Sequence, residues 1–225
     1  MQLTTAPPRH QSALDLRRTC LHYILLLTVW VGAWLAFGAL GIAAQSSAAQ
    51  FVYWTAAKLL VWILPVFLIV RLGRHEAAVT YLSLENVKRG LRVGVLFGVA
   101  LAAVSLLADV ATKHFGWPSA GFALVNVLLI APVFEEIVFR GFFLRELQDA
   151  RIAFWPANII AALMFLGLHF PGWYFVGRLT PGQAVVAPGI CLVGLVAGYA
   201  KRRAGSTWAG VAVHFVNNLY SSFLH

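Results

Sequence analysis

Charged residues are scarce in this chain. Only 11% of its 225 residues are Asp, Glu, Lys or Arg, while 60% are hydrophobic. A water-soluble domain carries about 25% charged residues. The polar surface available here is too small to cover a soluble fold of this length. This shortage excludes a soluble protein and indicates that much of the apolar surface faces lipid.

Cysteines and acidic residues are also few. Cys20 and Cys191 have no paired spacing, so neither a disulfide framework nor a zinc knuckle is expected. Seventeen basic against eight acidic residues give a formal net charge of +9. The basic residues are dispersed in short segments between apolar runs, where they set membrane topology. We therefore expect a lipid bilayer as the surrounding medium and no nucleic acid as a partner.

Long apolar runs dominate what is present. A transmembrane helix needs about 20 mostly apolar residues, and the runs predict an all-α, polytopic membrane helix bundle of about seven transmembrane helices. We divide the chain into a basic leader (1–22), an N-terminal three-helix membrane segment (23–112) and a C-terminal core (119–225). The predicted spans are residues 23–42, 51–70, 93–112, 121–148, 154–170, 184–200 and 207–224.

The first run has an alternative interpretation as a signal peptide, because Ser47, Ala48 and Ala49 resemble a cleavage site. Its apolar core of 20 residues exceeds the 7–15 residues typical of signal peptides. We favour a membrane span.

The basic residues give an independent test of the seven-helix topology. With a cytoplasmic N-terminus, fourteen Lys and Arg residues fall on the inside and two, Lys113 and Arg178, on the outside. Such a bias follows the positive-inside rule. It predicts a cytoplasmic N-terminus and an outside C-terminus. The compact chain, without retention or lipidation motifs, favours a bacterial inner membrane. The inside residues are Arg9, Arg17, Arg18, Arg71, Arg74, Lys88, Arg89, Arg92, Arg140, Arg145, Arg151, Lys201, Arg202 and Arg203.

Ionisable side chains inside the predicted spans are the candidates for function. Each costs at least about 2.5–3.5 kcal/mol to insert at the centre of a helix, so its presence needs a reason. Lys58 lies near the middle of its span, and Asp109 is one candidate partner for it. The full set is Lys58, Asp109, Glu135, Glu136, Arg140, His169 and His214.

Two adjacent glutamates in the fourth predicted span have different surroundings. Glu136 and Arg140 are spaced i,i+4 with the acid first, the favourable order for an ion pair on one helical face. Glu135 points about 100° away from that face. A buried carboxylate without an ion-pair partner is suited to act as a general base, because desolvation destabilises its charged form.

Depth along the helices brings further polar groups to the same layer. Glu135 lies seventeen residues before Ile152, at the turn between the fourth and fifth spans, and His169 lies seventeen after it. In an antiparallel hairpin both side chains then lie about 20–25 Å from the turn. His214, which shares a helical face with Asn218, is about 16 Å beyond the basic turn that ends at Arg203. A lone membrane histidine commonly has only a structural hydrogen-bonding role. The matched depth of all these groups instead predicts one polar intramembrane site.

Three motifs at these residues resemble those of the CAAX protease and bacteriocin-processing (CPBP, or Abi) family. They are EExxxR at Glu135, Glu136 and Arg140, FxxxH at Phe165 and His169, and HxxxN at His214 and Asn218. The resemblance covers roughly residue 121 to the C-terminus and makes the C-terminal core (119–225) the catalytic part.

The resemblance implies an intramembrane endopeptidase similar to the type II CAAX prenyl endopeptidase. Its substrate would be a membrane-associated or lipid-modified protein. Glu135, assisted by His169, would activate water for attack on a peptide bond. His214 and Asn218 would stabilise the oxyanion, where preorganised donors contribute several kcal/mol. Glu136 and Arg140 would support the site.

A zinc-dependent variant is the alternative mechanism. Glu135, His169 and His214 could supply three ligands and leave a fourth position for water, as in catalytic zinc sites. The sequence contains no HExxH motif, and Asn218 is a poor zinc ligand. We therefore expect a glutamic-type protease without a cofactor.

Two other functions are weighed against proteolysis. A non-enzymatic bacteriocin-immunity or scaffolding protein would bind a peptide without cutting it. Its motifs would be expected to degenerate, and all of them are intact here. A proton-coupled transporter could also use buried His and Glu, but no pair of broken helices recurs in corresponding halves.

One segment departs from the family pattern. Residues 170–188 contain Pro171, Pro181 and Pro188, which break a continuous helix. The segment could be re-entrant, but we expect an outside loop.

Overall fold

The computed structural model describes residues 9–73, 77–109 and 113–224, and in this part of the chain the fold is entirely helical. No strand occurs among these residues; the one β-bridge joins Phe115 and Leu224. The predicted all-α class is confirmed. The main helices are α1 (Arg9–Ala39), α2 (Ser47–Lys58), α3 (Leu64–Gly73), α4 (Ala78–Tyr81), α5 (Val87–Asp109), α6 (Phe122–Val125), α7 (Ala131–Glu136), α8 (Leu144–Asp149), α9 (Phe154–Gly167), α10 (His169–Phe175), α11 (Pro181–Ala204) and α12 (Trp208–Ser222).

Several of these helices join end to end through π-helical turns. The π-helix η2 (Leu59–Ile63) connects α2 to α3, while η3 (Asn126–Ile130) and η4 (Ile137–Phe143) connect α6, α7 and α8. A π-helical turn makes i→i+5 hydrogen bonds, is rare, and frequently occurs at functional sites. A short 3₁₀ helix, η1 (Ile42–Ala44), turns the chain from α1 into α2.

Within the described residues, six helical stretches are long and apolar enough to cross a membrane: Asp15–Ala39, Ser47–Gly73, Val87–Leu107, Phe122–Asp149, Phe154–Phe175 and Pro181–Ala204. They correspond to the first six predicted spans. The seventh predicted span, residues 207–224, is a helix, α12, but has only 15 residues. Leu72, Leu96 and Leu107 are 82%, 72% and 79% exposed, which suits a surface in contact with lipid. The protein is an integral membrane protein.

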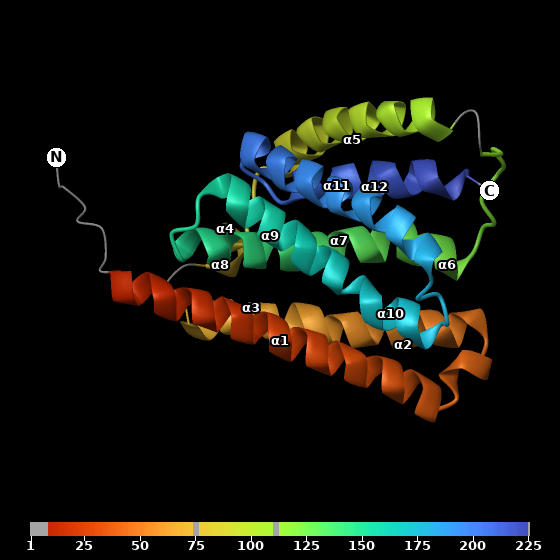
Figure 1. The fold of residues 1–225 in the computed structure, drawn as a ribbon, viewed down its shortest axis with the longest axis horizontal. Helices are drawn as coiled ribbons and strands as arrows, with labels where there is room; N and C mark the ends of the chain where they lie inside the picture. Colours follow the sequence, from red (N-terminus) through yellow and green to blue (C-terminus); the bar gives the residue numbers. More distant parts are fainter. Residues whose placement is uncertain (1–8, 74–76, 110–112, 225) are drawn as a thin grey trace.

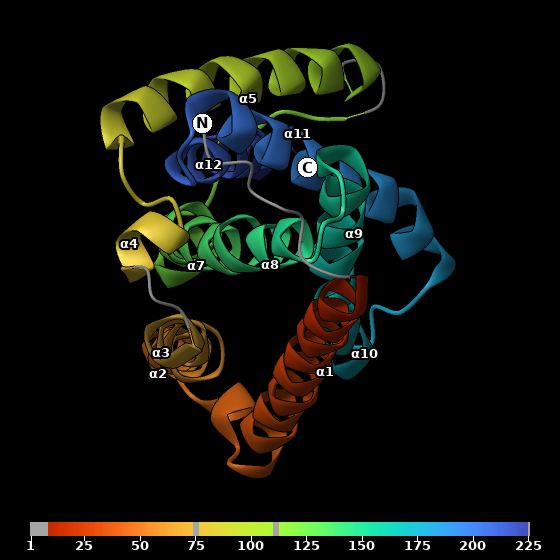
Figure 2. The same cartoon turned by 90° about the vertical axis from the view of Figure 1, so that its left-hand side faces the viewer.

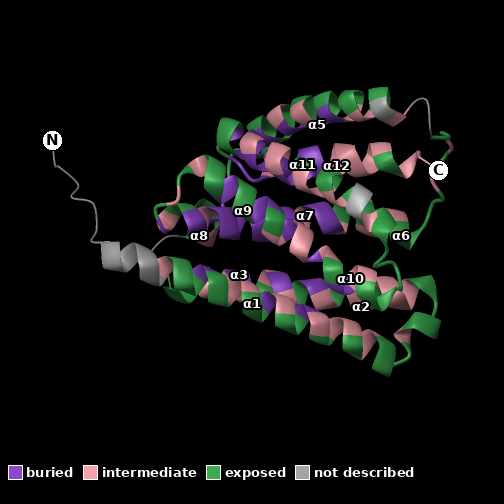
Figure 3. Cartoon of the chain, viewed as in Figure 1, coloured by how far each residue is buried: buried purple, intermediate pink, exposed green. Residues whose placement is uncertain are grey.

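The helices form layers around the α7–α8 rod (Figure 1). Seen from one end, α5 covers α11 and α12, which lie above α7, α8 and α9, and α1 with the α2–α3 rod lies below (Figure 2). Burial is greatest along α7, α8 and α9 in the middle layer (Figure 3). The C-terminal half of the chain thus forms the core of the bundle, and α1 to α3 cover one side of it.

Element boundaries differ from the prediction at the N-terminal end. Helix α1 begins at Arg9, so described residues of the basic leader continue the first membrane helix. Arg74 and residues 110–112, which belonged to a predicted inside segment and to the third span, lie outside the described residues.

The expected outside loop at residues 170–188 is wrong. Helix α10 contains Pro171, and α11 begins at Pro181 and continues through Pro188. Proline at the first position of a helix lacks only an N–H that would have no partner, so Pro171 and Pro181 fit near helix starts. Pro188 lies inside α11, where membrane helices tolerate proline because neighbours satisfy the freed groups.

Basic residues concentrate at one end of the bundle. This end of the bundle contains the starts of α1, α5 and α9 and the ends of α3, α8 and α11 (Figure 1). Lys113 and Arg178 follow α5 and α10 towards the opposite end. The fold is therefore compatible with the charge asymmetry noted in the sequence.

Candidate active site

Glu136, Arg140 and His214 form the buried centre of the candidate site. Glu136 and Arg140 are fully buried, and one carboxylate oxygen of Glu136 accepts a hydrogen bond of 3.0 Å from Arg140. The same oxygen lies 3.0 Å from Nδ1 of His214. The ion pair expected between Glu136 and Arg140 is present, and the carboxylate of Glu136 also orients His214.

Glu135 lies beside this cluster but faces a different environment. Its side chain is buried, and Oε2 of Glu135 lies 3.9 Å from Nε2 of His214. Glu135 also lines a cavity of about 490 Å³ together with His169. Glu135 is therefore the carboxylate that can meet a water molecule or a substrate, while Glu136 is enclosed.

His169 has a defined tautomer in this arrangement. Its Nδ1 lies 3.0 Å from the carbonyl oxygen of Phe165, which can only accept, so Nδ1 carries the hydrogen. In the neutral ring Nε2 is then an acceptor. This nitrogen is available to bind a water molecule in the cavity that His169 shares with Glu135.

Phe165 explains why the phenylalanine and the histidine of FxxxH occur together. Its ring contacts the rings of His169 and His214 at centroid distances of 5.0 and 5.6 Å. The guanidinium of Arg140 lies 4.7 Å from the same ring, within the range of a cation–π contact. Phe165 thus fixes three of the polar groups relative to one another.

Asn218 lies one helical turn beyond His214 on α12. Its amide donates a hydrogen bond of 2.9 Å to the carbonyl oxygen of Val127, a residue that lines the cavity. This bond joins α12 to η3. The sequence analysis predicted Asn218 as a site residue, and the structure shows the backbone carbonyl that its amide binds.

The start of α12 is anchored by side chains that donate hydrogen bonds to backbone carbonyl groups between Leu82 and Glu85. Ser206 and Thr207 donate hydrogen bonds of 2.6 Å to the carbonyl oxygens of Glu85 and Leu82. The indole of Trp208 donates to the carbonyl of Leu84 at 2.9 Å. These bonds set the position of the helix that carries His214.

Two glycines allow other helices to approach the buried charges. A Cβ atom added to Gly210 would lie 2.6 Å from Oε2 of Glu136, and one added to Gly194 would lie 2.7 Å from a guanidinium nitrogen of Arg140. Only glycine leaves room at these positions.

Three polar residues that the sequence analysis did not assign to the polar site also lie here: Lys58, Asn126 and Lys201. Lys58 is buried, lines the cavity with Glu135, and donates a hydrogen bond of 3.1 Å to Oδ1 of Asn126. The pairing considered between Lys58 and Asp109 does not occur; Asp109 accepts a hydrogen bond from Tyr220 at 3.0 Å. Lys201, counted as a loop charge, is buried and donates to the carbonyl oxygen of Arg140 at 2.5 Å. The signal for Lys58 was its position within an apolar span, but no motif indicated its partner.

The zinc alternative would require Glu135, His169 and His214 to surround one point. Among the described residues, no group of three or more His, Cys, Asp and Glu side chains is arranged to hold a metal ion. Glu135, His169 and His214 belong to that part of the chain, so their placement does not fit a three-ligand zinc site. We derive no chemical step through a metal.

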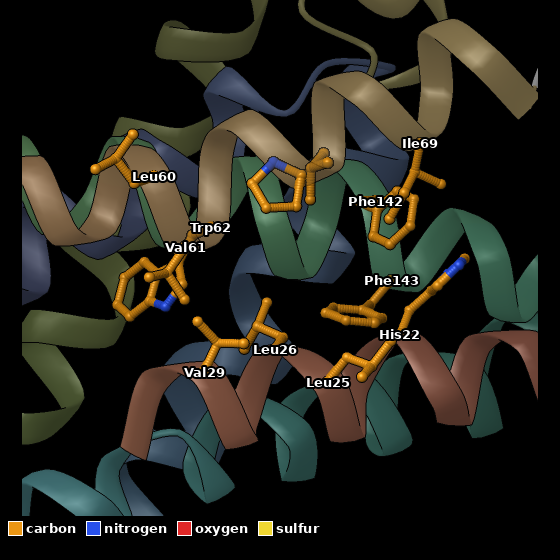
Figure 4. A pocket seen from close by; sticks show the side chains of 12 residues that line it. His22, Leu25, Leu26, Val29, Leu60, Val61, Trp62, Ile69, Phe142 and Phe143 are labelled. Atoms are coloured by element: carbon orange, nitrogen blue, oxygen red, sulfur yellow. The ribbon is translucent and has the colours of Figure 1, made fainter. Parts of the chain in front are cut away.

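A second cavity lies away from these groups, between α1 and the α2–α3 rod. It measures about 170 Å³ and is lined mainly by apolar side chains, including Leu26, Val61 and Phe143 (Figure 4). His22 is its one ionisable lining residue. It lacks the facing acids and bases of the first cavity.

The fold and site together define a polytopic helical membrane protein with a buried glutamate and histidine centre. Residues 116–220 match the family described as Type II CAAX prenyl endopeptidase Rce1-like, and they contain all three motifs. This match supports the assignment to the CAAX protease family that the motifs predicted. At the level of the family, the match supports a CAAX-type intramembrane protease.

Similarity to another protein extends beyond the family match. The chain is 27% identical over 210 residues to an Escherichia coli protein described as an uncharacterized 24.3 kDa protein, with 85% of this chain and 92% of the relative covered. No solved structure matches the chain.

Proposed function

We propose that the protein is a glutamic-type intramembrane endopeptidase in which Glu135 activates water to hydrolyse a peptide bond of a membrane-associated or lipid-modified protein. The observation that carries this proposal is the contrast between two adjacent glutamates. Glu136 is enclosed by Arg140 and His214, whereas Glu135 opens on the cavity that also contains His169. A base must reach water and substrate, and Glu135 has that access.

The reaction begins with a water molecule held by the carboxylate of Glu135 and by Nε2 of His169. Glu135 removes one proton from the water as its oxygen attacks the carbonyl carbon of the peptide. The carbonyl oxygen becomes an oxyanion. Glu135 then gives the proton to the departing amine as the C–N bond breaks, which restores the carboxylate.

His214 and Asn218 stabilise the oxyanion in this proposal. The Nδ1 hydrogen of His214 is directed at Glu136, so Nε2 donates to an oxyanion only when the ring is doubly protonated. The carboxylate of Glu136 supports that cationic form. Asn218 has a second amide hydrogen besides the one that binds the Val127 carbonyl.

The bacterial inner membrane, with the N-terminus in the cytoplasm, is the location we propose. The positive-inside charge pattern supports this orientation, and the relative in Escherichia coli supports a bacterial membrane.

Replacing Glu135 by Gln tests the mechanism. Gln keeps the shape of the side chain but cannot accept a proton, so turnover should fall by about 10²–10⁴-fold, the usual contribution of a general base. Wild-type protein and Glu135→Gln are expressed in a host without the natural gene, and new peptide termini in the membrane proteome are counted by mass spectrometry. Asp109→Asn, an acid-to-amide change outside the cavity, is the control.

Cleavage that persists in Glu135→Gln at normal protein abundance would refute the glutamate base. Cleavage absent from both proteins would instead favour the binding or immunity function. The purified wild-type enzyme is also assayed with a metal chelator, and we expect activity to be retained. Loss of activity that zinc restores would favour the metal-dependent mechanism.

A further inference from the structure

The cavity beside Glu135 has more hydrogen-bond donors than acceptors in its wall. Lys58 and Arg178 line it as cations, and Glu135 is the one acidic residue among its lining residues. Lys58 lies at the junction of α2 and η2, outside the segment that matches the family. The N-terminal helices therefore supply polar chemistry to the site.

Lys58 is buried and forms no ion pair with an acidic side chain in the described part of the chain. It is 6% exposed, and its ammonium donates to the neutral amide of Asn126 and lies 5.5 Å from the ring centroid of Trp62. Glu135 lines the same cavity and attracts the Lys58 ammonium electrostatically, but the two side chains do not form a direct ion pair in the described structure. An ammonium has three hydrogens to donate, and the Asn126 amide uses one of them. A buried cation of this kind costs free energy unless an anion joins it.

Two further donors lie in the same wall. The indole nitrogens of Trp34 and Trp62 are buried and have no acceptor within the described part of the chain. Both tryptophans line the cavity. Indole nitrogen only donates, so each of these groups needs an oxygen that the described protein atoms do not supply.

We propose that Lys58, with the tryptophans around it, forms a subsite that binds a carboxylate of the peptide substrate. This inference rests on the proposed function. The carboxylate would bind the Lys58 ammonium inside the cavity and would place the scissile bond at Glu135, which lines the same cavity. Lys58 is then a specificity-determining residue. The carboxylate can belong to the C-terminus of the substrate or to an Asp or Glu side chain.

The test compares the cleavage sites of four proteins in host membranes: the wild type, Lys58→Met, Lys58→Arg and Lys88→Met. Methionine keeps much of the length of lysine and removes its charge. Lys88 is exposed at the start of α5, so Lys88→Met is a control with the same loss of charge. Sites are accepted only when they disappear in Glu135→Gln. Protein abundance and thermal unfolding in detergent are measured for each variant.

Wild-type sites should carry a carboxylate at a fixed distance from the cleaved bond. A fixed distance to the chain end identifies the C-terminal carboxylate, and a fixed Asp or Glu position identifies a side chain. Lys58→Met should reduce cleavage at these sites by about 10- to 100-fold relative to sites without a carboxylate, as expected for losing a hydrogen bond to a charged group. Lys58→Arg should retain much of the preference, and Lys88→Met all of it.

Other outcomes overturn the subsite. Wild-type sites without a positioned carboxylate, or an unchanged preference in Lys58→Met, would do so while leaving the protease intact. Uniform loss of cleavage in normally folded Lys58→Met would assign Lys58 to turnover and not to selection. If no site depends on Glu135, the proposed function fails, and the inference fails with it.

Discussion

At the scale of single residues, the buried charges of the site depend on one another. Glu136 binds both Arg140 and His214 through the same oxygen, and all three side chains are buried. Removing one member of a buried ion pair leaves the other charge without compensation, which typically costs about 3–5 kcal/mol. Stability and catalysis are therefore coupled at Glu136.

We predict that Arg140→Met destabilises the protein by about 3–5 kcal/mol, because Glu136 keeps a buried negative charge. The double variant Glu136→Gln with Arg140→Met should be less destabilised than the sum of the two single variants. Unfolding of the purified protein in detergent measures both effects. Arg145→Met, at a partly exposed ion pair with Asp149, is the control and should change stability by about 1 kcal/mol or less.

Additive effects of the two single substitutions would contradict a coupled pair. The same single and double variants also distinguish a loss of stability from a loss of catalysis. A double variant that regains stability should still be inactive, since His214 has lost the carboxylate that orients it.

At the scale of helices, close packing of α5 against α12 holds His214 in place. Gly90, Gly94 and Gly98 are spaced four residues apart on one face of α5, and all three are buried. A Cβ atom added to Gly94 would lie 2.3 Å from the carbonyl oxygen of Ala209 and 2.6 Å from Cβ of Ala212. Small residues at this spacing allow membrane helices to approach closely.

We predict that Gly94→Ala destabilises the protein by about 1–3 kcal/mol, as overpacking does. It should also lower activity, because α12 must move and carries His214 with it. The matched control is Gly38→Ala in α1, where the added methyl group meets nothing within 4 Å. Thermal unfolding and cleavage assays are run on both variants. Equal behaviour of the two would show that the contact between α5 and α12 does not position the site.

At the scale of the whole molecule, the short helix α12 decides the position of the C-terminus. Six stretches in the described part of the chain satisfy the length and composition of a membrane span, and α12 has only 15 residues. Residues 209–214 in its first half are buried within the bundle. A helix enclosed by protein need not match the lipid thickness, so α12 can complete a seven-helix topology.

We predict that the C-terminus lies outside the cytoplasm and the N-terminus inside. Alkaline phosphatase fused after His225 should be active, because it folds only outside the cytoplasm, while green fluorescent protein at the same position should be dark. Fusions after Arg151, in the turn between α8 and α9, should show the opposite pattern. A fluorescent fusion after His225 would leave α12 as a helix that does not cross the membrane.

Much of this architecture could be predicted from the sequence because lipid imposes a simple rule. Apolar runs of sufficient length must become helices, since each backbone group needs an internal partner. The same rule made Glu135, Glu136, Arg140, His169 and His214 conspicuous, because ionisable groups are costly at that depth. The spacing of Glu136 and Arg140 also sufficed to predict their ion pair, a contact within one helix.

The tertiary structure decided what depends on contacts between distant segments. Lys58 and Asn126 are 68 positions apart, and no local spacing indicates their hydrogen bond. Residues 170–188 were expected to form a loop from their prolines, but α10 and α11 extend through most of this segment. The π-helical turns and the glycine contacts of α5 likewise arise from packing. The sequence by itself determined which residues had to be helical and which charges needed partners, because those are costs of burial in lipid. Which partner each charge received depended on how the helices packed.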